Sequence, residues 1–97
     1  MVTSLTPQRL HERLEAGEPL LVLDVREPEE IAIARFDGAL EIPMQEIPGR
    51  LGELDAAAEI VVLCHHGMRS AHVAGYLVEN GFTHVANLTG GIDAWSL

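Results

Sequence analysis

One short segment of this chain combines residue types that could do chemistry: Cys64-His65-His66-Gly67-Met68-Arg69-Ser70. It contains the single cysteine of the 97-residue chain, it follows the apolar run 60–63, and a helical pattern begins within it. Backbone N–H groups at a helix N-terminus have no intrahelical acceptor and carry partial positive charge, so they stabilise a thiolate over a thiol. This placement predicts that Cys64 is a nucleophile.

The spacing from Cys64 to Arg69 suits a loop that binds an anion. The intervening backbone can curl into a ring of inward-facing amides, and Gly67 supplies the conformational freedom that such a loop needs. The Arg69 guanidinium either orients an anionic ligand or pairs with Asp24 or a nearby glutamate and holds the loop in shape. The alternative for Cys64 is a structural core cysteine, but core cysteines seldom sit in a polar loop that contains glycine.

Two histidines follow the thiol directly. Protonated His65 or His66 would help to keep Cys64 ionised. We favour the alternative, in which both side chains shape the rim of the site, because a ring of amides uses the main chain. These residues and His72 lack the paired spacing of structural zinc modules, so we expect no metal. Ser70 is expected to cap the following helix rather than act as a nucleophile.

Strands and helices alternate along the chain. Buried strands are predicted over 20–25, 39–41, 60–63 and 84–87. One helix is predicted from Pro7, capped by Thr6, to Gly17, with Leu10 and Leu14 on its apolar face. Others are predicted over 28–33 and 69–80, with short helical segments after residue 43, over 50–54 and over 91–95. This alternation implies a parallel sheet with helices on both faces.

The order of these elements also locates the candidate site. Parallel α/β sheets bind ligands at the carboxyl ends of their strands, and Cys64 follows one central strand directly. Asp24 ends another predicted strand, so we expect it beside the Cys64 loop. Within the helix over 69–80, four residues are expected to face inward: Ala71, Ala74, Leu77 and Val78.

Size and composition indicate one globular domain over residues 1–97. An apolar fraction of 47% argues against disorder. One cysteine cannot form an internal disulfide, which suits a reducing cytoplasm. No apolar run approaches the ~20 residues that span a bilayer, and no signal-peptide pattern opens the chain.

The charge balance excludes two classes of partner. Fifteen acidic residues against six basic ones give a formal net charge of −9, which repels nucleic-acid phosphates and anionic lipid. All the basic residues are arginine, so Schiff-base chemistry on a lysine is excluded. A small anionic ligand would therefore have to be attracted locally, by the loop amides and Arg69.

Five segments along most of the chain carry a family resemblance: 23–30, 38–39 with 42–43, 64–70, 80–82 with Val85, and 90–95. In this order they resemble the signature segments of the rhodanese family of sulfurtransferases. The resemblance implies an α/β rhodanese-like three-layer domain, with a central, mostly parallel sheet and helices on both faces. It ends close to the last residue, so the tail common in such domains is expected to be absent.

The resemblance also implies an activity. The Cys64 thiolate would take sulfane sulfur from thiosulfate or a similar small anionic donor, form a persulfide, and pass the sulfur to cyanide, a thiol or a protein acceptor. The resemblance assigns the binding of donor and persulfide to His65, His66, Gly67, Met68, Arg69 and Ser70. It implies that Asp24 and Arg26 brace the loop, and no cofactor is required. With no second cysteine, the sulfur must leave to an external acceptor.

Two alternatives and one departure accompany this interpretation. In phosphatases related to this fold, the active-site loop resembles Cys-x5-Arg. Here four residues separate Cys64 from Arg69, and this shorter loop favours a sulfur substrate over a phosphate. A non-catalytic sulfur-binding or sensing module stays open. In segment 34–39, Arg35 stands where the family usually has a histidine, and Asp37 stands where it usually has a proline. This departure leaves the packing of that turn open. Trp95 is expected in the core, as one wall of the site.

Overall fold

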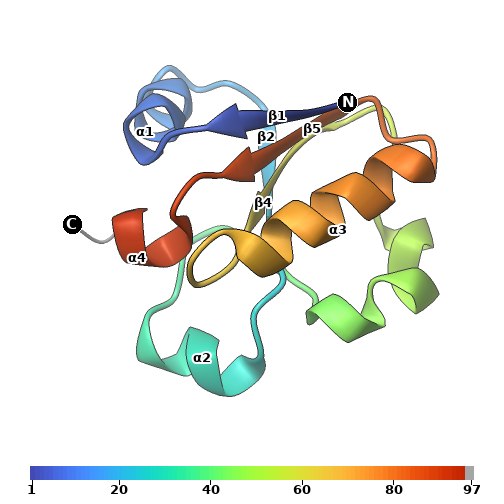
Figure 1. Cartoon of the computed structure of the whole chain (residues 1–97). Coiled ribbons are helices and arrows are strands. Elements are labelled where there is room, and N and C mark those ends of the chain that lie inside the picture. The colour runs from blue at the N-terminus through green and yellow to red at the C-terminus, as the bar shows by residue number, and fades with distance from the viewer. Residues whose placement is uncertain (96–97) are drawn as a thin grey trace.

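A computed structural model of the chain describes residues 1–95 and shows a five-stranded sheet with strand order β1-β5-β4-β2-β3 (Figure 1). The strands are β1 (Val2–Leu5), β2 (Leu20–Asp24), β3 (Leu40–Glu41), β4 (Glu59–Leu63) and β5 (His84–Leu88). Each neighbouring pair in this order is parallel. The parallel sheet predicted from the alternation of elements is confirmed.

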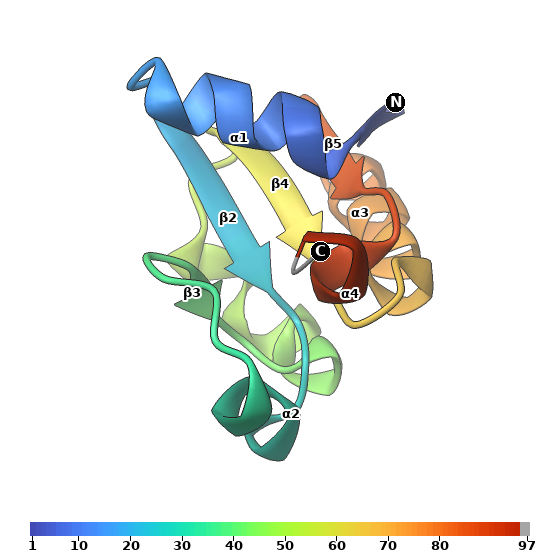
Figure 2. The ribbon, with the colours of Figure 1, turned by 90° about the vertical axis from the view of Figure 1, so that its left-hand side faces the viewer.

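Helices cover both faces of the sheet. They are α1 (Pro7–Glu15), α2 (Pro28–Ile33), α3 (Met68–Glu79) and α4 (Gly91–Trp95), with 3₁₀ segments η1 (Met44–Glu46) and η2 (Pro48–Glu53). Helices α1 and α4 pack on one face through Leu10 and Ile92. Helix α3 packs on the other through Val73 and Leu77, where Ile47 joins it. Figure 2 shows α1 and α4 on the near side of β4 and α3 behind it.

Local signals account for the ends of the first two helices. The Thr6 hydroxyl oxygen accepts from the backbone N–H of Arg9 at 3.1 Å, and Pro7 occupies the first turn, as predicted. Helix α2 begins at Pro28, also as predicted. A capping box holds its start, in which the side chains of Glu27 and Glu30 accept from each other's backbone N–H. The capping box was not predicted, and it fixes Glu30 close to the site described below.

Two parts of the sequence prediction need correction. Strand β1 was not predicted, because this edge strand has only Val2 and Leu5 as apolar residues and its middle is exposed. Ala71 was expected to face inward and is exposed, whereas Ser70 and Val73 are buried. Ala74 and Leu77 are buried as predicted, and Val78 packs partly buried against the core, so hydrophobic period misplaced only the Ala71 edge of this face.

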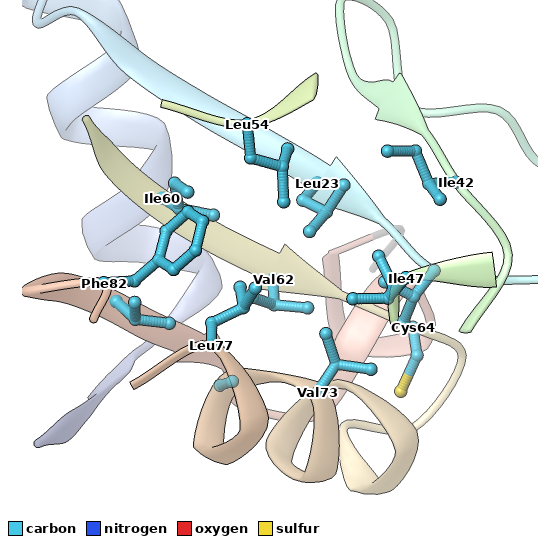
Figure 3. Close-up of a cluster of buried hydrophobic side chains, with 13 residues drawn as sticks. Leu23, Ile42, Ile47, Leu54, Ile60, Val62, Cys64, Val73, Leu77 and Phe82 are labelled. Atoms are coloured by element: carbon cyan, nitrogen blue, oxygen red, sulfur yellow. The ribbon is translucent and has the colours of Figure 1, made fainter. Parts of the chain in front are cut away.

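Cys64 belongs to the core cluster between the sheet and α3. Figure 3 shows it at one end of this cluster, beyond Val62 of β4, with its sulfur directed toward α3. The same cluster includes Leu23 of β2 and Ile47, which follows η1. The nucleophile predicted from the sequence is therefore anchored in the hydrophobic core between the sheet and α3.

The segment that departs from the family pattern packs through Phe36, whereas the departing residues Arg35 and Asp37 are exposed. Phe36 is buried, and its ring lies 4.9 Å from that of Trp95 between centroids. Arg35 pairs with Glu41, Nη1 to Oε2 at 3.2 Å.

Trp95 is half-buried against the cluster on the α1 face. It lines a cavity of about 720 Å³ with Thr6 and His11, and none of the lining residues belongs to the Cys64 loop.

Candidate active site

Strand β4 brings Cys64 to the carboxyl edge of the sheet, beside the end of β2. Asp24 pairs in register with Leu63, and the Val25 N–H donates to the Leu63 carbonyl at 3.0 Å. Cys64 and Asp24 therefore follow neighbouring strands at one edge, as the sequence predicted.

The sulfur of Cys64 accepts two backbone hydrogen bonds. The N–H of Gly67 lies 3.1 Å from Sγ and that of Ser70 lies 3.3 Å from it. The residue is only 1% exposed. Burial alone would fit a structural cysteine, but donors aimed at the sulfur are what a thiolate requires.

The balance of these surroundings favours the thiolate. Burial of the side chain raises the pKa of the Cys64 thiol. The nearby Ser70 hydroxyl and the backbone N–H groups of Ser70, Gly67 and Arg69 together lower it by more, so the pKa lies below its ordinary value. This is the direction that a nucleophilic cysteine needs.

Helix α4 holds the outer side of the loop. The N–H of Ile92 donates to the Cys64 carbonyl at 2.8 Å, and the N–H of Asp93 donates to the His65 carbonyl at 3.1 Å. Because a trans peptide unit is planar, its N–H points opposite to its C=O. The N–H groups of His65 and His66 are consequently turned away from α4.

Gly91 permits this contact. A Cβ on this residue would lie 2.4 Å from the carbonyl oxygens of both Cys64 and His65, and its φ of 63° disfavours any side chain. Gly67 has the same requirement inside the loop, since its φ is 97° and a Cβ would lie 3.1 Å from the backbone nitrogen of Gly90. Both glycines let two backbone segments approach closely.

Ser70 does not cap α3, contrary to the prediction. The helix begins at Met68 with Gly67 as the N-cap residue, so Ser70 lies inside the first turn and is buried. Its hydroxyl donates to Oδ1 of Asn87, a residue of β5 that the sequence analysis did not single out. The available signal was a polar residue between the apolar residues Ala86 and Leu88 of the strand.

Arg69 is held by a glutamate. Its Nη1 and Nη2 each donate to one oxygen of Glu30 at 2.7 Å. The Arg69 guanidinium lowers the pKa of Glu30 to about 2, and Glu30 in turn raises the pKa of Arg69. Of the two roles considered from the sequence, the pair with a nearby glutamate is present in the structure; Asp24 is not that partner.

Asp24 pairs instead with Arg26 in the interior. Arg26 Nε and Nη2 donate to the Asp24 carboxylate at 3.0 and 2.7 Å, and the Arg26 backbone N–H adds a bond at 3.1 Å. Both residues are almost fully buried. Arg26 also donates to the Glu30 carbonyl at 3.4 Å. The buried pair therefore contacts the segment that holds Arg69, and its contact with the Cys64 loop runs through Glu30.

The two histidines and Met68 lie at the surface. The rings of His65 and His66 stack with centroids 4.0 Å apart, and His66 Nδ1 lies 3.9 Å from an oxygen of Asp93. Met68 is 82% exposed. Within residues 1–95, no group of three or more His, Cys, Asp or Glu residues is arranged to hold a metal ion. The same residues form no helix that is long and apolar enough to cross a membrane.

Known proteins resemble this chain in sequence. A family model described as "Rhodanese-like domain" matches residues 6–97. A sulfurtransferase of Allochromatium vinosum is 38% identical over 96 residues, covering 99% of this chain and 90% of that protein. The thiosulfate sulfurtransferase GlpE of Pseudomonas aeruginosa is 30% identical over 91 residues, covering 94% of this chain and 81% of that protein.

A solved structure shows the same likeness. The crystal structure of a rhodanese-like domain protein from Staphylococcus aureus superposes with a TM-score of 0.90 at 35% identity. The match covers 96% of this chain and 90% of that one. Similarity in sequence and in fold therefore extends over almost the whole chain.

Proposed function

This chain belongs to the rhodanese-like domain family, and we propose that it is a sulfurtransferase that carries sulfane sulfur on Cys64. The observation that supports this most directly is the pair of N–H groups, from Gly67 and Ser70, that contact the Cys64 sulfur. They stabilise negative charge at the atom that must act as the nucleophile.

In the first step, the Cys64 thiolate attacks the outer sulfur of thiosulfate or a similar donor. A bond forms between Cys64 Sγ and that sulfur, and the bond from the outer sulfur to the sulfonate breaks. Its electron pair leaves with sulfite. The product is a Cys64 persulfide whose terminal sulfur carries the negative charge.

In the second step, an external thiolate attacks the terminal sulfur, takes it, and releases the Cys64 thiolate. Thiol–disulfide chemistry within the chain is excluded, because Cys64 is the single cysteine. Cyanide can replace the thiol in an assay and yields thiocyanate. We place this reaction in a reducing cytoplasm, with a thiol or protein acceptor and no nucleic acid or membrane partner.

The persulfide needs more donors than the thiolate, because its charge lies one sulfur further out. We assign this task to the N–H groups of His65 and His66, which α4 turns away from itself by binding their peptide carbonyls. The exposed imidazoles shape the rim. No cofactor takes part in this scheme.

Arg69 would bind the sulfonate of an anionic donor at the mouth of the loop. Each of its terminal nitrogens has a second N–H besides the one given to Glu30, and the Arg69 side chain is 34% exposed. An anionic donor can use these N–H groups while Glu30 keeps the side chain in place. If Arg69 only holds the loop, its loss should affect charged and uncharged donors equally.

Intact mass before and after thiosulfate tests the proposal. Thiosulfate should add one sulfur atom, cyanide should remove it as thiocyanate, and Cys64→Ser should abolish both steps while the protein stays folded. If thiosulfate and other sulfane donors give no adduct and no thiocyanate, the chain is a non-catalytic module.

A second assay tests the phosphatase alternative. Cys64 and Arg69 are separated by four residues, one fewer than in the phosphatase-like pattern, so aryl phosphates should not be hydrolysed. Hydrolysis that disappears in Cys64→Ser would show a phosphatase instead.

A further inference from the structure

Asn87 is a polar residue in the interior half of strand β5. Its neighbours Ala86 and Leu88 are buried, and Asn87 itself is partly buried. It pairs in register with Val62 of β4, the strand that ends one residue before Cys64. A buried amide in this position is costly unless both of its ends are hydrogen-bonded.

Both ends of the Asn87 amide bind the Cys64 loop. Nδ2 donates to the carbonyl of Gly67 at 3.1 Å, and Oδ1 accepts from the Ser70 hydroxyl. The Gly67 carbonyl can only accept, so it fixes which end of the amide is Nδ2 and leaves Oδ1 facing Ser70. Gly67 and Ser70 are the two residues whose N–H groups contact the Cys64 sulfur.

We propose that Asn87 is a positioning residue for the sulfur chemistry of Cys64: by binding Gly67 and Ser70 together, it holds the loop amides against the sulfur. The inference rests on the proposed function for its chemical purpose. The Gly67 carbonyl accepts from Asn87 and also from the Ala71 N–H of α3 at 3.3 Å. Asn87 and the helix therefore orient the peptide unit between Gly67 and Met68 together, and the Met68 N–H points away from β5. Strand β5 thus binds a carbonyl in the second half of the loop, as α4 binds the carbonyls of Cys64 and His65 in the first half.

Asn87 also competes with the sulfur for a proton. The Ser70 hydroxyl has one proton, and two acceptors face it, Asn87 Oδ1 and Cys64 Sγ. Replacing Asn87 therefore has two opposite effects: the amides of the loop are less well placed, and the hydroxyl proton becomes free for the thiolate. Removing the hydroxyl abolishes the second effect and leaves the Asn87 bond to the Gly67 carbonyl, so the contribution of that bond to the first effect can be measured alone.

The test is Asn87→Val, made in the wild-type protein and in Ser70→Ala. Valine suits a strand and carries no hydrogen-bonding group. The rate of iodoacetamide alkylation is measured against pH. In the Ser70→Ala background, Asn87→Val should slow alkylation near neutral pH about three- to tenfold, which is the range expected for one well-placed hydrogen bond. With Ser70 present the loss should be smaller, because the freed hydroxyl turns to the sulfur.

Asn80→Val is the matched control. Asn80 Nδ2 donates to the Tyr76 carbonyl at 2.8 Å, a bond of the same kind at the opposite end of α3 from Cys64. This variant should stay within twofold of wild type. Should Asn87→Val fail to fold, Asn87→Asp serves instead, since it keeps the shape and the acceptor for Ser70 but removes the donor to Gly67.

Two results would overturn the inference: an unchanged alkylation profile for the Asn87 variant in Ser70→Ala, or an equal loss in the Asn80 control. Alkylation needs no sulfur donor, so the outcome is independent of the proposed function. If wild type takes no sulfur from any donor yet the alkylation pattern appears, the proposed function fails and the positioning role stands. If sulfur is transferred but the pattern is absent, only the role of Asn87 fails.

Discussion

Replacing Gly91 by alanine tests whether helix α4 holds the Cys64 loop. The new Cβ would lie 2.4 Å from the carbonyl oxygens of Cys64 and His65 and 2.6 Å from the His65 carbonyl carbon. All three are backbone atoms that no side-chain rotation can move. The loop and α4 must therefore separate.

The expected cost follows from the bonds that this separation breaks. A side chain in the left-handed region costs about 1–2 kcal/mol. The bonds from Ile92 and Asp93 to the loop carbonyls contribute roughly 0.5–1.5 kcal/mol each. Gly91→Ala should then lower the free energy of unfolding by about 2–5 kcal/mol. Because the loop amides lose their orientation, the pKa of the Cys64 thiol should also rise toward ~8.5.

Urea unfolding measures the first effect and the pH dependence of alkylation measures the second. Gly75→Ala is the control, since a Cβ there meets no atom within 4 Å and the residue lies in α3. That change should stabilise the protein by about 0.5–1 kcal/mol. A loss below about 1 kcal/mol for Gly91→Ala, with an unchanged alkylation profile, would refute the reasoning.

Three further predictions concern ionisable side chains around the loop. Arg69→Ala should raise KM for thiosulfate about ten- to a hundredfold and affect an uncharged sulfane donor less, whereas equal losses would show that Arg69 only holds the loop. Because the pKa of Glu30 is lowered from 4.5 to about 2, its ion pair stabilises the fold fully above pH 4.5 and is lost as the pH falls toward 2. Urea unfolding at pH 3 and pH 6 measures this dependence. In Glu30→Gln, the difference in the free energy of unfolding between the two pH values should be smaller by about 1–2 kcal/mol, allowing for solvent screening. Replacing His65 and His66 together by alanine should leave the alkylation profile unchanged; an upward shift of the thiol pKa would mean that an imidazolium sustains the thiolate.

Much of the fold could be predicted because its signals are local. The Thr6 cap, the start of α2 at Pro28 and the strand that ends before Cys64 each depend on a few neighbouring residues. Strand β1 was missed because its pairing with β5 comes from residues more than 80 positions away, as the Thr3 hydroxyl bond to the Val85 carbonyl shows. An edge strand with few apolar residues has no local pattern to detect.

The site divides in the same way. The position of Cys64 between strand and helix could be predicted, and so could Asp24 at the same edge. The partner of Arg69 could not, because Glu30 lies 39 positions away among several other glutamates. The role of Asn87 was equally hidden, since its two bonds cross 17 and 20 positions of sequence. Such pairings depend on how the elements pack, which hydrophobic period does not specify.

The contacts that α4 and β5 make with the Cys64 loop have a consequence for biosynthesis. A ribosome makes the chain from the N-terminus, so Cys64 is translated before the residues that bind the loop carbonyls, Asn87, Ile92 and Asp93. A nascent chain that has not yet folded these later elements has a thiol without an ordered ring of amides, and its reactivity is that of an ordinary cysteine. The loop amides can therefore lower the pKa of the Cys64 thiol only after β5 and α4 have folded against the loop.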